Sequence, residues 1–258
     1  MEDKEAIDIL RPRSRASRSE KNPVEDEYHP HHYTTILTPY THMKKILPGK
    51  VYELLKKLNT PVKIQNFLDE IPMNFELEGD TCFSPMTVLE KNTCHCTEGA
   101  ILAALILRVH NHPPLLLDLA ADKTDYDHVV AAFKIDGRWG AISKTNHSVL
   151  RYREPVYKSV RELAMSYFHD YVNINTRKKT LRSFAGPVNL SRFDRLGWMT
   201  NRGEVFYIPE YLADAEHKKI INRKQIINLR QADKIEIKVG SIMEWPDPEG
   251  RPPKYPTY

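Results

Sequence analysis

The sequence has little of what marks a secreted, membrane or nucleic-acid-binding protein. No apolar run approaches the ~18 residues that a membrane span needs, and the polar N-terminus has no apolar signal-peptide core. Its Lys and Arg residues are interleaved with Asp and Glu, and the net charge is only +4 over 258 residues. We therefore expect no membrane partner, no nucleic-acid partner and a cytoplasmic location.

Cysteine is also scarce. The chain has 3 cysteines, an odd number, and two of them, Cys94 and Cys96, are separated by a single residue. This pattern does not form a disulfide framework. In a reducing cytosol each free thiol needs another explanation, which is burial, metal binding or chemical reactivity.

Composition divides the chain into three parts. Residues 1–30 are polar, mixed in charge and poor in aromatics, which predicts a disordered tail. Residues 31–240 are expected to form a single domain with a helical N-terminal part, because Met43–Ile71 has the pattern of short amphipathic helices broken at Pro and Gly. Residues 241–258 are rich in Pro and are predicted to be irregular.

The centre of the chain has the clearest pattern. Thr97–His110 predicts a helix with too many apolar residues for one face, so it should be buried on all sides. Leu115–Ala121 has the length of a strand, and two strand-like runs joined by Asp136-Gly137 predict a β-hairpin. This order predicts an α+β fold in which a buried helix packs on one face of an antiparallel sheet.

The second half of the chain is patterned less clearly. We expect a helix over Glu154–Asn173 and a basic loop over Arg177–Thr200, in which Lys178, Lys179 and Arg182 could bind an anionic group. Asp118 and Asp122, near the first strand, are expected to serve turns. The remaining expected elements are a strand in Gly203–Leu212, a surface helix over Asp214–Asp233 and an alternating strand over Lys234–Ile242.

Cys96 lies at the first turn of the predicted buried helix. The free N–H groups and the positive end of the helix dipole stabilise a thiolate there, and they can also hold the oxyanion of a tetrahedral intermediate. His128 opens a strand 32 residues later (128 − 96 = 32). If the chain returns it to the helix start, its imidazole could take the thiol proton and later protonate a leaving amine.

These residues resemble the transglutaminase-like members of the papain-fold cysteine enzymes. In that family a Cys opens an Ala-rich helix, a His begins a strand, a Trp leads the next strand, and an Asp follows the Trp by four residues. The matching segments are "CTEGAILAALILR", "DHVVAAFKIDGRWGAIS" and Trp139, within about Thr81–His147. The resemblance implies a papain-like, transglutaminase-like core, with Cys96 as nucleophile, His128 as general base and no cofactor.

The third catalytic position departs from the family pattern. Ser143 stands where the family has Asp. A carboxylate would orient the imidazole and stabilise its cationic form, whereas a hydroxyl can orient it without bringing charge. Asn146 is an alternative orienting residue, because papain-like enzymes use an amide in that role. Ser143 therefore joins Cys96 and His128 as a candidate catalytic residue.

The implied activity is acyl transfer, or hydrolysis of a peptide or small amide, through a thioester on Cys96. The alternative is a non-catalytic binding or scaffolding module that keeps the fold and has lost the acidic third member. A separate alternative for the thiols is a zinc site, although the spacing of Cys94 and Cys96 is shorter than structural zinc sites use. Its candidate ligands are Cys82, Cys94, His95, Cys96 and His128.

Overall fold

A buried helix and an antiparallel sheet organise residues 40–244, the part of the chain that the computed structural model describes. These residues belong to one compact unit, and their mixture of helix and antiparallel strand confirms the predicted α+β class. The predicted disordered tail over residues 1–30, and all but residues 241–244 of the predicted irregular tail, lie outside the described residues.

Four short helices come first, and three of them lie where the broken amphipathic pattern over Met43–Ile71 predicted short helices. Pro61 and Pro85 each occupy a first helical position, where the missing N–H costs nothing. Thr60 and Ser84 precede them and cap the helices, accepting the N–H of the third residue that follows. The helices are α1 (Tyr40–Ile46), α2 (Gly49–Lys57), α3 (Pro61–Glu70) and α4 (Pro85–Lys91).

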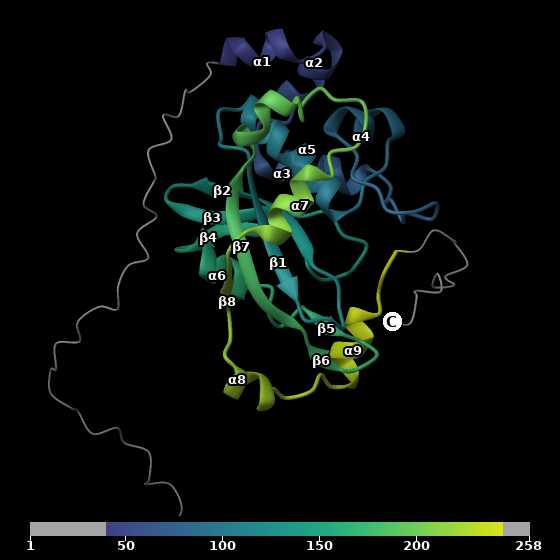
Figure 1. Cartoon of the computed structure of the whole chain (residues 1–258), viewed down its shortest axis with the longest axis vertical. Coiled ribbons are helices and arrows are strands. Elements are labelled where there is room, and N and C mark those ends of the chain that lie inside the picture. The colour runs from purple at the N-terminus through teal and green to yellow at the C-terminus, as the bar shows by residue number, and fades with distance from the viewer. Residues whose placement is uncertain (1–39, 245–258) are drawn as a thin grey trace, which may run out of the picture. The chain divides into compact units, whose positions relative to one another are not determined.

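The predicted buried helix is α5 (Cys96–Val109), and only Arg108 and Cys96 among its residues are not fully buried. It packs on the main sheet, whose strand order is β4-β3-β2-β1-β7-β8 with antiparallel neighbours (Figure 1). Its strands are β1 (Leu115–Ala121), β2 (His128–Ile135), β3 (Arg138–Ile142), β4 (Arg153–Tyr157), β7 (Leu181–Asn189) and β8 (His217–Lys219). A second small sheet pairs β5 (Val172–Asn173) with β6 (Lys178–Lys179).

The predicted hairpin joins β2 and β3 at Asp136-Gly137. These two residues have φ values of 49° and 75°, the left-handed backbone that a tight hairpin turn of this kind requires. Trp139 is the second residue of β3 and pairs with Lys134 of β2. The hairpin therefore places the start of β2 and the end of β3 at the same end of the sheet, which matters for the site.

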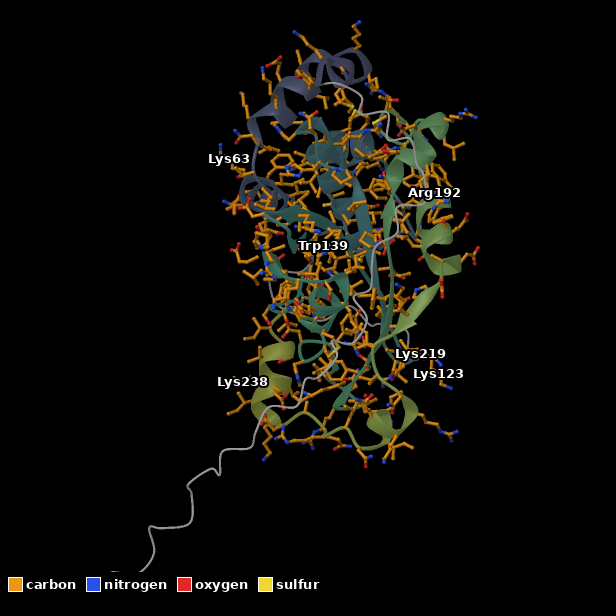
Figure 2. The ribbon with its side chains drawn as sticks, turned by 90° about the vertical axis from the view of Figure 1, so that its left-hand side faces the viewer. Lys63, Lys123, Trp139, Arg192, Lys219 and Lys238 are labelled. Atoms are coloured by element: carbon orange, nitrogen blue, oxygen red, sulfur yellow. The ribbon has the colours of Figure 1, made fainter. Side chains whose placement is uncertain are left out.

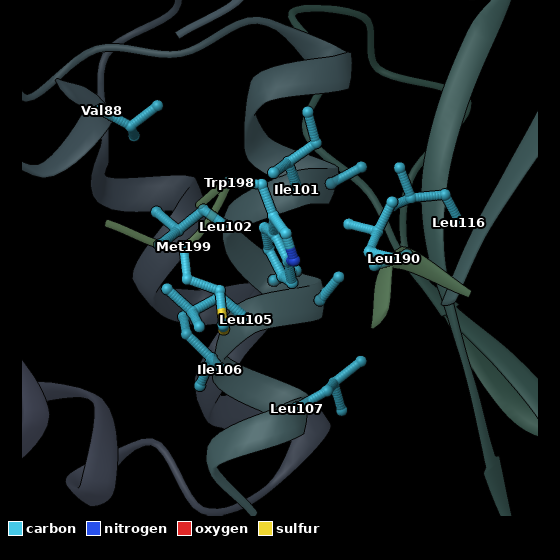
Figure 3. Packing of buried hydrophobic residues seen from close by; sticks show 14 of the residues in the cluster. Val88, Ile101, Leu102, Leu105, Ile106, Leu107, Leu116, Leu190, Trp198 and Met199 are labelled. Carbon is cyan, nitrogen blue, oxygen red and sulfur yellow. The ribbon is translucent and has the colours of Figure 1, made fainter. Parts of the chain in front are cut away.

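The two faces of the sheet belong to different apolar clusters. On one face Leu116, Val129 and Ala131 pack with α5, and Trp198 fills the space beside this helix (Figure 3). On the other face Leu117 and Val130 belong to a cluster that also contains the buried aromatics of residues 160–171, namely Tyr167, Phe168 and Tyr171. The alternation of side chains along β1 and β2 thus separates the two layers of the core.

The predictions for the second half of the chain were largely wrong. Glu154–Asn173 is not one helix, because Ser159 caps a new helix, α6 (Val160–Met165), after β4 has paired with β3. Arg177–Thr200 is not a loop, since it contains β6, β7 and the 3₁₀ helix η1 (Leu190–Leu196). The predicted surface helix over Asp214–Asp233 is instead β8 followed by the short helix α8 (Arg223–Ile227).

Two predicted strands are helices. Gly203–Leu212 overlaps α7 (Tyr207–Asp214), in which Ile208 and Leu212 are the buried residues one helical turn apart. Lys234–Ile242 contains α9 (Lys234–Gly240), whose alternating apolar residues suggested a strand. A capping box between Asp233 and Glu236 fixes its first turn and overrides that alternation.

The Lys and Arg side chains labelled in Figure 2 are not gathered in one part of the surface. Lys63, Arg192 and Lys238 project from different parts of the molecule, whereas Lys123 and Lys219 lie near each other in this view (Figure 2). Among the described helices, none is both long and apolar enough to cross a membrane.

Gly99, in the first turn of α5, is needed for close packing. An added Cβ would lie 2.6 Å from Cβ of Lys144, and Lys144 is held in place because its ammonium donates to the carbonyls of Leu68 and Ile71. We expect Gly99→Ala to lower the free energy of unfolding, because overpacking costs about 1–3 kcal/mol and exceeds the ~1 kcal/mol gain in helix propensity.

Equilibrium urea unfolding measures this effect, with Gly49→Ala as the matched control. Nothing lies within 4 Å of a Cβ at Gly49, so this variant should be as stable as the wild type or slightly more stable. Equal stability of Gly99→Ala and Gly49→Ala would contradict the packing argument.

Candidate functional site

Cys96 is the first residue of α5, and its side chain is partly exposed although the helix behind it is buried. His95 is the N-cap, and its Nδ1 accepts the Thr97 N–H at 3.2 Å. The thiol therefore lies where the free N–H groups and dipole of a helix favour negative charge. The position predicted for Cys96 at the first turn is confirmed.

His128 is the first residue of β2 and is buried, with 5% of its surface exposed. Its Nε2 lies 2.8 Å from Oγ of Ser143, the residue that follows β3. The Ser143 hydroxyl donates its own hydrogen to the Leu150 carbonyl at 2.6 Å, so it must accept from His128. This network assigns a proton to Nε2 and leaves Nδ1 as the nitrogen available to the thiol.

His128 interacts with Cys96 and lowers the pKa of its thiol. Burial by itself would raise the pKa of the Cys96 thiol, but hydrogen bonds with His128 and His95 outweigh it, and the pKa lies well below that of an ordinary cysteine thiol. A lowered pKa means that more of the cysteine is present as the thiolate, which is its nucleophilic form.

Ser143 is itself held by a residue that sequence reasoning missed. Gln65, buried on α3, accepts the Ser143 N–H at 2.9 Å and donates to the Ser143 carbonyl at 2.8 Å. The alternative orienting residue, Asn146, donates its amide to the Glu244 carbonyl at 3.3 Å. Ser143 is therefore the residue that contacts the imidazole of His128.

Glu98 has a larger role than a favourable charge at a helix start. Its carboxylate is fully buried and accepts the N–H groups of His95 at 2.9 Å and Phe83 at 2.8 Å. It also accepts the Thr81 hydroxyl at 2.8 Å and the Asn74 amide at 3.1 Å. Glu98 thus closes the capping box and ties the loop over residues 74–83 to the start of α5.

The other two cysteines are packed in the core. Cys82 and Cys94 are buried and, like Cys96, free of disulfides. Burial raises the pKa of Cys94 to about 12 despite the nearby Lys144, and it also raises the pKa of Cys82. Within residues 40–244 no three His, Cys, Asp or Glu side chains are grouped so that they could hold a metal ion, so the arrangement gives the zinc alternative no ligand set.

A buried His–Asp pair was missed by sequence reasoning. Asp118 does not serve a turn: it lies within β1, is buried, and its Oδ2 is 2.9 Å from Nε2 of His217 on β8. The small Ala185 of β7 stands between them in the sheet, so the His217 side chain can reach across. Burial raises the pKa of Asp118 to about 6, although the hydrogen bond with His217 opposes this.

The basic segment is mostly neutralised by partners. Lys179 is buried and forms an ion pair with Glu236 at 2.9 Å. Arg182 pairs with Asp122 at 2.5 Å, and Asp122 also receives the Thr124 N–H in the turn predicted for it. Of the three cations considered for anion binding, Lys178 alone is exposed, so the expected anion site lacks a cluster of available charges.

Comparison with known proteins gives no family assignment. The chain matches no protein-family model, and no curated protein matches it at a significant level.

Replacing Glu98 tests how strongly the site depends on its carboxylate. In Glu98→Gln the side-chain NH₂ would face at least one of the N–H or O–H donors that now point at the carboxylate. We expect the free energy of unfolding to fall by about 1–3 kcal/mol, the usual cost of a buried polar group left without a partner. Chemical denaturation measures the change.

Glu90→Gln is the control for this prediction. Glu90 pairs with Arg202 at the surface, where the two side chains are 48% and 69% exposed, and such a pair contributes only ~0–1 kcal/mol. An equally small effect at Glu98 would show that the carboxylate does not organise the start of α5.

Proposed function

We propose that the protein is a cysteine-dependent enzyme that transfers an acyl group, or hydrolyses a peptide or small amide, through a thioester on Cys96. The observation that carries the proposal is the side-chain interaction of Cys96 with a histidine whose other nitrogen is fixed by Ser143 at 2.8 Å. Cys96 would be the nucleophile, His128 the base and Ser143 the group that orients the base.

The proposed reaction begins with attack of the Cys96 sulfur on the acyl carbonyl carbon. His128 Nδ1 takes the thiol proton and returns it to the leaving amine as the carbon–nitrogen bond breaks. Water or a second amine then attacks the thioester, loses a proton to His128 and releases Cys96. The N–H groups at the start of α5 are suited to the oxyanion formed in both steps.

The papain-like core implied by the resemblance is part of this proposal. Its support is a cysteine at the start of a buried helix, a histidine at the start of an adjoining antiparallel strand, and a third residue at the end of the next strand. The three free thiols fit a reducing compartment, so we propose the cytoplasm as the location.

A non-catalytic module is the competing function, and Ser143 is the observation in its favour. The hydroxyl orients His128 but carries no charge, so it cannot stabilise an imidazolium as the family's carboxylate would. A protein that had kept the fold as a binding surface would show the same geometry without turnover.

The pH dependence of thiol labelling separates these two functions. Iodoacetamide reacts with the thiolate, and an ordinary thiol with a pKa of ~8.5 is mostly protonated at neutral pH. Because the pKa of Cys96 is lowered, we expect its labelling, mapped by mass spectrometry, to remain fast below pH 7. Labelling of Cys96 that rises only near pH 8.5 would favour the non-catalytic module.

A trapped thioester tests the proposed chemistry directly. We expect a panel of ester, amide and peptide acyl donors to yield an acyl adduct on Cys96, detected by intact-mass spectrometry after acid quenching. Cys96→Ala should abolish the adduct without unfolding the protein, whereas Cys94→Ala should keep most of it, because Cys94 is buried at 0% exposure. Equal loss of adduct in both variants would contradict Cys96 as the nucleophile.

A further inference from the structure

The histidine that precedes Cys96 also faces the thiol. Nδ1 of His95 lies 4.0 Å from Sγ of Cys96, at the outer limit of a hydrogen bond to sulfur. The His95 side chain is only 13% exposed. The thiol therefore has two imidazole neighbours from different elements, one at the start of α5 and one, His128, at the start of β2.

The orientation of the His95 ring is fixed. Its Nε2 lies 2.9 Å from the Thr81 carbonyl, which can only accept, so Nε2 carries a proton. Nδ1 is therefore the nitrogen that meets Sγ of Cys96. The main chain of His95 is held as well, because its N–H donates to Glu98 at 2.9 Å.

Capping α5 does not by itself account for a histidine at this position. Ser, Thr, Asp and Asn are the preferred N-cap residues, and each would accept the Thr97 N–H without burying a ring. The groups around the His95 ring instead favour its protonated, positively charged form. Nε2 of His95 lies 3.5 Å from a carboxylate oxygen of Glu98 and 3.7 Å from one of Glu76, and nearby carboxylates stabilise the charged form of an imidazole.

We propose that in the resting protein His95, in place of His128, holds the thiol proton, so that a Cys96 thiolate–His95 imidazolium pair leaves His128 as the general base for the water or amine that attacks the thioester. The inference rests on the proposed function, since it concerns the same nucleophile. In this step the S–H bond breaks, its electron pair stays on sulfur, and the proton binds Nδ1 of His95. No other covalent bond forms or breaks.

The proton transfer has a cost that the new charges offset. A protonated Nδ1 no longer accepts the Thr97 N–H, so one capping bond is lost. The attraction between the thiolate and the imidazolium, about 4 Å apart in a partly buried site, is large enough to offset the loss of this hydrogen bond. Burial alone would lower the pKa of His95, but the interactions with Cys96, Glu98 and the Thr81 carbonyl raise it to about 10.

His95→Asn tests the pair and keeps the cap, because the Asn side chain can accept the Thr97 N–H. The thiol pKa is measured from the pH dependence of iodoacetamide labelling and of thiolate absorbance. Loss of an opposite charge within about 4–6 Å changes a pKa by about 1–3 units, so we expect the pKa of Cys96 to rise by that amount. His169→Asn, at an exposed histidine, should leave it unchanged.

The reciprocal variant keeps the inference testable if His95→Asn does not fold. In Cys96→Ser the thiolate is absent, so the pKa of His95, followed by NMR of its ring, should fall below the wild-type value. An unchanged thiol pKa in folded His95→Asn, or an unchanged His95 pKa in Cys96→Ser, would overturn the inference.

These outcomes are independent of the proposed function. If the thiol pKa does not depend on His95 but acyl donors still form a thioester on Cys96, the inference fails and the proposed function stands. If the thiol pKa depends on His95 and no donor forms a thioester, the ion pair stands and the enzymatic function fails.

Discussion

The start of α5 depends on one buried carboxylate. Four donors converge on Glu98, from Asn74, Thr81, Phe83 and His95, and they compensate the loss of solvent around its charge. The same contacts fix the loop before the helix and the direction in which α5 begins. Cys96 directly follows His95, the N-cap residue that Glu98 holds. The position of the Cys96 thiol therefore depends on the Glu98 carboxylate, which binds these four donors and not the sulfur.

The position of His128 depends on a separate, uncharged set of contacts. Gln65 holds the main chain of Ser143 from α3, and the Ser143 hydroxyl spans from Nε2 of His128 to the Leu150 carbonyl. This arrangement defines the tautomer without supplying negative charge. The carboxylates of Glu98 and Glu76 lie instead beside His95, so orientation and charge stabilisation belong to different histidines.

The sequence predicted what short-range patterns determine. The buried helix, β1 and the Asp136-Gly137 hairpin each follow from residues adjacent in the chain, whereas the expected contact of Cys96 with His128, 32 residues apart, depended on the chain returning His128 to the start of the helix. Contacts between distant segments left no such pattern: Gln65 is 78 residues from Ser143 and 99 residues separate Asp118 from His217. In the second half of the chain, the alternation of apolar and polar residues led to a wrong prediction of a strand, most clearly at α9. The Asp–x–x–Glu capping box that starts this helix was visible in the sequence.

The negative charge of each buried carboxylate near Cys96 is offset by partners of its own. Asp118 interacts electrostatically with Cys96, and an unpaired aspartate there would disfavour a thiolate. His217 donates from Nδ1 to the Ala215 carbonyl at 2.8 Å, so Nδ1 carries one proton. The contact between its Nε2 and the Asp118 carboxyl requires a second proton, because two unprotonated acceptors would repel each other. The pair is then neutral as a whole. Glu98 is likewise surrounded by donors, and the local field at the sulfur is governed by the helix N-terminus and the two imidazoles.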